Sequence, residues 1–70
     1  GRASRIGVSE IFSWGYDSTR DTNRLIVCSV DVDRVTWIEL PPFRKHAVLR
    51  QNTFEAIRDY IKTGWWIRCS

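Results

Sequence analysis

The stretch LIVCSVDVDRVTWIEL, residues 25–40, decides how this chain folds. Residues 25–30 are apolar and rich in β-branched side chains on both faces, which is typical of a strand inside a sheet or a small barrel. Residues 31–34 bring two aspartates that favour a turn, and residues 35–40 return to a strand pattern. We therefore predict a β-hairpin over residues 25–40.

Upstream of the hairpin, the alternation of apolar side chains along residues 6–14 predicts a first strand. Glu10 and Ile11 interrupt the alternation, which predicts a bulge near them. Residues 15–23 are rich in Gly, Asp, Ser, Thr and Asn and therefore predict a polar loop.

Downstream, Pro41-Pro42 ends the second strand of the hairpin, because neither proline can donate a ladder hydrogen bond. Residues 43–50 follow as a loop or a short strand. Arg44, Lys45 and Arg50 make this segment the strongest electrostatic feature of the chain. They fit a surface that neutralises phosphates, and equally a solvated loop whose charges keep a small protein soluble.

The clearest helix signal lies at residues 53–63. Asn52 can cap the helix, and Glu55 three residues later completes an arrangement like a capping box. Apolar residues then share one stripe, and Gly64 suits the left-handed residue that ends a helix. Residues 65–69 follow as a short final strand.

The predicted order is strand, strand, strand, helix, strand, so the fold class is α+β. We expect one small domain over residues 1–70, in which a curled antiparallel sheet of about four strands carries one helix. In strand order, residues 24–40 above all, the chain resembles small SH3-like or Tudor-like barrels, which implies a twisted sheet with a short helix at one end. Residues 1–4 are expected to be disordered or a remnant of cloning.

Composition favours a folded domain with an aromatic core. The chain is 70 residues long, 43% hydrophobic and 27% charged, which argues against disorder. Four Trp, three Phe and two Tyr supply large apolar areas to so small a domain. The predicted core consists of Ile6, Val8, Phe12, Leu25, Val27, Ile38, Leu40, Phe54, Ile57, Ile61, Trp65 and Ile67.

The final strand offers the most specific candidate site. On alternate faces, Trp65 falls with the apolar Ile67 and Cys69, so we assign that face to the core. Trp66 and Arg68 then project outward as a platform that stacks a base or clamps a peptide. In the alternative interpretation, Trp66 lies under a loop or caps the barrel end, with Arg68 covering it.

Trp37 lies in the second strand of the hairpin, where both faces are partly apolar. Its position beside Val35 in an interior strand favours burial. If exposed, Trp37 joins the aromatic surface around Trp66, so we include it among the candidate partner-binding residues.

The two cysteines, Cys28 and Cys69, are expected to be reduced, with Cys28 buried in its apolar run. Because the sequence shows no signal segment and the cysteines are expected to be reduced, we expect a cytoplasmic protein. No apolar run is long enough to span a bilayer, so we expect no membrane partner. No metal-ligand spacing and no phosphate-binding loop is present in the sequence, and we expect no cofactor.

These features predict a non-catalytic binding module. The net charge of +3 comes from nine Arg and two Lys against eight carboxylates, which permits a nucleic-acid partner without requiring one. We expect nucleic-acid binding through Trp66, Arg68, Arg44, Lys45 and Arg50. The alternative is a protein-interaction module, including a homodimer, centred on Trp66 and Trp37. A small nuclease, relying on the single His46 or a carboxylate, ranks behind both.

Overall fold

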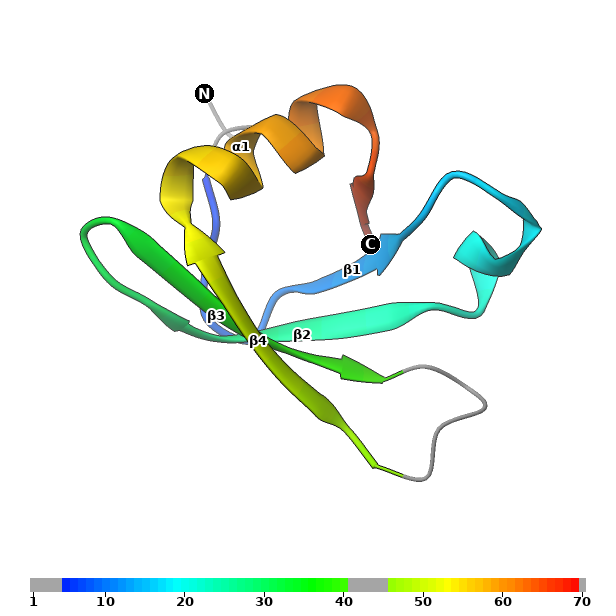
Figure 1. The fold of residues 1–70 in the computed structure, drawn as a ribbon, viewed down its shortest axis with the longest axis horizontal. Helices are drawn as coiled ribbons and strands as arrows, with labels where there is room; N and C mark the ends of the chain where they lie inside the picture. Colours follow the sequence, from blue (N-terminus) through cyan, green and yellow to red (C-terminus); the bar gives the residue numbers. More distant parts are fainter. Residues whose placement is uncertain (1–4, 41–45, 70) are drawn as a thin grey trace.

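The computed structural model describes residues 5–40 and 46–69 as an antiparallel sheet with one helix packed on it. The strands are β1 (Ile11–Trp14), β2 (Arg24–Val30), β3 (Arg34–Leu40), β4 (Val48–Thr53) and β5 (Trp66–Arg68), with the helix α1 (Phe54–Thr63) and the short 3-10 helix η2 (Ser18–Asp21) between them. The order across the sheet is β4-β3-β2-β1-β5. Figure 1 shows the sheet curling toward α1. The α+β class and the single small domain agree with the sequence prediction.

Two features of the sheet differ from the prediction. It has five strands, four of them before the helix, because the segment left open as a loop or a short strand contains β4. In addition, β4 and β5 are the two edges of an open sheet, so the described residues do not close into a barrel.

The hairpin of β2 and β3 is confirmed, and so is the favoured burial of Trp37, but Ile38 and Leu40, assigned to the core, lie on the other face of β3. Val27 pairs with Trp37 in the antiparallel register, and directly opposed residues share a face of the sheet. Because Val27 is buried, Trp37 is buried with it. Ile38 pairs instead with Ile26 on the other face, where it is half-buried.

The first strand is shorter than predicted, because the chain turns at Val8 and Ser9 before β1 begins at Ile11. Ser9 has a φ of 72°, and its N–H donates to the carbonyl of Val27 at 2.7 Å. This turn leaves Val8 60% exposed, so its assignment to the core was wrong.

The predicted range of the helix is confirmed, but its N-cap is a different residue from the predicted one. The hydroxyl of Thr53 accepts from the N–H of Ala56 at 3.1 Å, so Thr53 is the N-cap. Asn52 lies in β4, where its side-chain amide donates to the hydroxyl of Tyr60 at 3.2 Å. Gly64 ends the helix with a φ of 87°, and its N–H donates to the carbonyl of Ile61.

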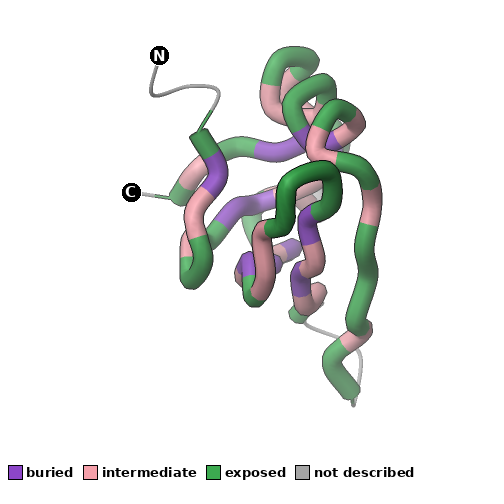
Figure 2. The backbone as a smooth tube through the Cα atoms, turned by 90° about the vertical axis from the view of Figure 1, so that its left-hand side faces the viewer, coloured by how far each residue is buried: buried purple, intermediate pink, exposed green. Residues whose placement is uncertain are grey.

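The core lies between the sheet and α1, as the buried segments in Figure 2 indicate. Its buried residues are Ile6, Phe12, Leu25, Val27, Val35, Trp37, Ile57 and Trp66. Of the predicted core, Leu40 and Ile67 are instead exposed on the other face of the sheet. Ile38, Phe54, Ile61 and Trp65 are half-buried.

Candidate interaction surface

Trp66 lies in the core, which contradicts its predicted exposure. Its partner in the register of β1 and β5 is Trp14, on the same face of β1 as the fully buried Phe12. The side chain of Trp66 is consequently 2% exposed, whereas Ile67, assigned to the core, is 43% exposed. The indole cannot serve as an exposed stacking platform in this fold.

The basic side chains predicted to flank Trp66 do not form one surface with it. Arg68 is half-buried, forms an ion pair with Glu10 and has its guanidinium 5.3 Å from the ring centroid of Phe12. Arg50 lies on β4, where its Nε is 3.1 Å from the carboxylate of Glu39. Glu39 also accepts from the indole N–H of the buried Trp37 at 3.2 Å.

Arg44 and Lys45 lie outside the described residues. Among the predicted site residues, Trp66 and Trp37 do lie together, with their ring centroids 4.9 Å apart, but they lie inside the core. The Arg and Trp surface expected from the sequence is not formed by the described members of the set.

A different surface emerges from the sheet register. Ile11 pairs with Ile26, Ile26 with Ile38, and Ile38 with Leu49, across β1, β2, β3 and β4. Because directly opposed residues share a face, the four side chains form one line across the sheet. We call these four residues the aliphatic row. They lie on the face that does not contain Phe12, Val27 and Trp37, and we call it the outer face.

The outer face is substantially exposed. Leu49 is 67% exposed and Ile11 is 46% exposed, while the two central members of the row, Ile26 and Ile38, are half-buried. Figure 1 shows α1 on one side of the sheet and no described helix on the other. Contiguous apolar side chains of this kind on a small domain mark an interaction surface more often than isolated exposed ones do.

Two further aliphatic side chains, Leu40 and Ile67, lie beside the aliphatic row on the outer face. Ser13 pairs with both Ile67 and Arg24, and Arg24 pairs with Leu40, so all four lie on the outer face. The guanidinium of Arg24 donates to the carbonyls of Arg20 and Asn23, so it is held against the loop between β1 and β2.

The opposite flank of the row is polar. Ser29 pairs with Thr36, and Thr36 pairs with Gln51, which gives a second line of side chains parallel to the aliphatic row. No carboxylate occurs among the paired residues of the outer face. An apolar centre with polar and cationic margins is the composition of a protein-binding surface.

The two cysteines are both free thiols and both exposed, so the predicted burial of Cys28 was wrong. Cys28 lies at the irregularity between Val27 and Ser29, and its thiol donates to the carbonyl of Thr36 at 3.4 Å. The N–H of Cys69 donates to the carbonyl of Ile11, next to the aliphatic row.

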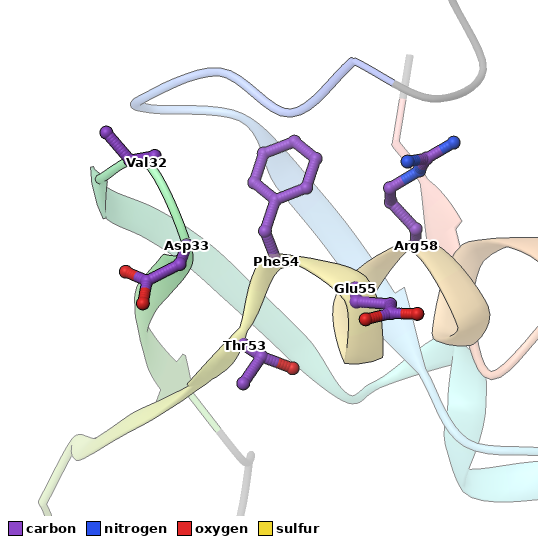
Figure 3. A pocket seen from close by; sticks show the side chains of 6 residues that line it. All are labelled: Val32, Asp33, Thr53, Phe54, Glu55 and Arg58. Carbon is purple, nitrogen blue, oxygen red and sulfur yellow. The ribbon is translucent and has the colours of Figure 1, made fainter.

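A shallow hollow of about 390 Å³ lies between the turn of the hairpin and the start of α1. It is lined by Val32, Asp33, Thr53, Phe54, Glu55 and Arg58. In Figure 3 the charged side chains of Asp33, Glu55 and Arg58 point in different directions. Because they do not converge on one point, the hollow offers no set of groups that would hold a small ligand.

Sequence reasoning missed the outer face because both faces of the hairpin strands are apolar. The available signal was the number of helices. A single helix covers one face of a sheet, so apolar residues on both faces of its central strands indicate that one apolar face stays uncovered.

Other kinds of site find no support in the described part of the chain. There, no group of three or more His, Cys, Asp or Glu side chains is placed to hold a metal ion. No helix in the described residues is long and apolar enough to cross a membrane. Comparison with protein-family models, with curated proteins and with solved structures gives no match for this chain.

Proposed function

We propose that this domain is a protein-interaction module that binds an apolar partner surface on its outer face. The observation that carries the proposal is the aliphatic row, in which four side chains from four strands lie in direct register. Removing such a contiguous apolar line from water is favourable and, unlike a charge contact, is little affected by salt.

The anatomy of the face supports this function over ligand binding or catalysis. The most exposed members, Leu49 and Ile11, lie at the ends of the row, and the half-buried Ile26 and Ile38 form its centre. Packed central residues with more accessible neighbours give a rigid platform, because the centre is held in place by its own sheet.

Nucleic-acid binding stays a prediction, but it loses the base-stacking role given to Trp66. Its remaining basis is the net charge of +3 and the segment that contains Arg44 and Lys45. Titration with single-stranded and double-stranded oligonucleotides tests it, because binding through these cations must weaken steeply as salt rises.

Site-specific photo-cross-linking tests the proposed interaction function. A benzophenone side chain placed at Leu49, in the cell from which the protein comes, is expected to give an adduct of discrete mass. The matched control carries the same group at Val32, which is fully exposed in the hairpin turn and not part of the outer face. This control is expected to give no such adduct.

Ile11→Lys in the chain that carries the probe at Leu49 is expected to abolish the adduct, because it places a charge in the same row. Equal adducts from both probe positions, or an adduct that survives Ile11→Lys, would contradict the proposal.

A further inference from the structure

We infer that the partner bound on the outer face is a second copy of this chain, so that two sheets pack face to face about a two-fold axis. The inference rests on the proposed interaction function and names its partner. It goes beyond that function in specifying which residues of the two copies meet.

The aliphatic row is self-complementary. It has two members on either side of the line between β2 and β3, in the order Ile11, Ile26, Ile38, Leu49. A two-fold axis along that line places Ile26 over Ile38 of the second copy and Ile11 over Leu49 of the second copy. Each contact then occurs twice, as an isologous interface requires.

The residues on either side of the aliphatic row favour a two-fold axis along the strands over one that runs across them. With the axis along the strands, the polar line of Ser29, Thr36 and Gln51 faces its own counterpart, and Arg24 faces Leu40. An axis across the strands would set the polar line against the flank that contains Arg24 and Leu40. The first arrangement places hydroxyl and amide groups where they can hydrogen-bond to one another.

Charge does not oppose the pairing. No carboxylate lies among the paired residues of the outer face, and the guanidinium of Arg24 is directed to backbone carbonyls of its own chain. The two copies of Arg24 lie beside the axis, about one strand spacing apart in projection, so the like charges stay apart only because each guanidinium is held by carbonyls of its own chain. Arg34, which pairs with Thr53, is the second cation of the outer face and lies exposed at the opposite end of the hairpin strands.

The outer face approaches the area that a stable dimer needs only when nearly all of it takes part. A standard interface buries about 800 Å² on each partner, and the whole described surface is 4994 Å². The strands range from seven residues in β2 and β3 to three in β5. At about 3.3 Å per residue and about 4.8 Å between strands, their plane is about 430 Å² in projection, and projecting side chains raise the accessible area above that. Nearly the whole outer face must therefore take part.

The size of the domain favours the same conclusion. The chain has 70 residues, and domains of this length bury a smaller fraction of their surface than larger ones do. Packing two sheets through their outer faces gives each copy a second apolar layer.

Sedimentation equilibrium of the full chain tests the inference. At micromolar concentration the mass is expected to be twice the 8.2 kDa of one chain. Leu49→Lys, at a 67% exposed position on the edge strand β4, is expected to weaken the dimer by about tenfold or more. Val32→Lys adds the same charge away from the outer face and is expected to leave the dimer unchanged. Near-ultraviolet circular dichroism checks that both variants stay folded.

A charge-swap experiment tests the predicted pairing. Ile11→Glu and Leu49→Lys should each weaken self-association when studied alone. An equal mixture of the two variants should recover the dimeric mass, because the two substituted side chains face each other at one contact and the other contact is unchanged. Failure of the mixture to recover would overturn this pairing.

Two results would overturn the inference without contradicting the proposed function. A chain that stays at 8.2 kDa up to about 1 mM, yet gives a photo-adduct of another mass, has a different partner on the same face. A dimer insensitive to Leu49→Lys associates through another surface. A monomer that gives no photo-adduct contradicts both the inference and the proposed function.

Discussion

At the scale of single residues, Trp66 joins the sheet to the helix. Its ring centroid is 5.0 Å from that of Phe12 on β1, 4.9 Å from that of Trp37 on β3 and 5.7 Å from that of Tyr60 on α1. Tilted and edge-on contacts of this kind add to the area that a large ring buries. The residue that the sequence suggested as a binding platform is therefore a structural centre.

Replacing Trp66 tests this assignment. Trp66→Ala is expected to lower the free energy of unfolding by about 3 to 5 kcal/mol, because it leaves a cavity among three rings. Urea unfolding followed by far-ultraviolet circular dichroism measures the change. Trp65→Ala is the matched control, and a smaller loss is expected because Trp65 is only half-buried. Equal losses from the two variants would show that Trp66 contributes no more to the core than the half-buried Trp65, against its assignment as the structural centre.

At the scale of elements, features that depend on neighbouring residues were predictable from the sequence, whereas features that depend on strand register were not. The helix and the hairpin were predictable because caps, turns and apolar periodicity act over a few residues. The faces of β3 and β5 were not predictable, because apolar side chains lie on both sides of each strand. For β5 the choice is made by pairing with β1, which places Trp66 opposite Trp14, 52 positions earlier in the sequence.

The same distinction explains the error at the helix start. Both Asn52 and Thr53 are good N-cap residues, so the sequence offers two adjacent candidates. The choice depends on Asn52 being held in β4 opposite Val35 and hydrogen-bonded to Tyr60, contacts that no local pattern encodes.

The cap assignment makes a prediction for the helix as an element. Thr53→Ala is expected to cost about 1 kcal/mol in unfolding free energy, because the N–H of Ala56 loses its acceptor. Thr53→Ser keeps the hydroxyl and should stay close to the wild-type value. Chemical denaturation of both variants measures the difference, and an equal loss from both would argue against the hydroxyl as the cap.

At the scale of the whole molecule, the described residues place α1 on one face of a five-stranded sheet and leave the other face open. The covered face holds the aromatic core, and the open face carries the aliphatic row. The sequence indicates that one apolar face stays uncovered, but it does not identify the members of the aliphatic row, since they are single residues from four separate strands. Only the register that joins those strands makes them neighbours.

Isotope-filtered nuclear magnetic resonance on an equal mixture of labelled and unlabelled chains tests the central claim most directly. Our account predicts intermolecular nuclear Overhauser effects between methyl groups of the aliphatic row, with Ile26 to Ile38 and Ile11 to Leu49 as the main pairs. Intermolecular contacts that come only from other surfaces, such as Val32 in the hairpin turn, would contradict it, as would the absence of any intermolecular contact at millimolar concentration.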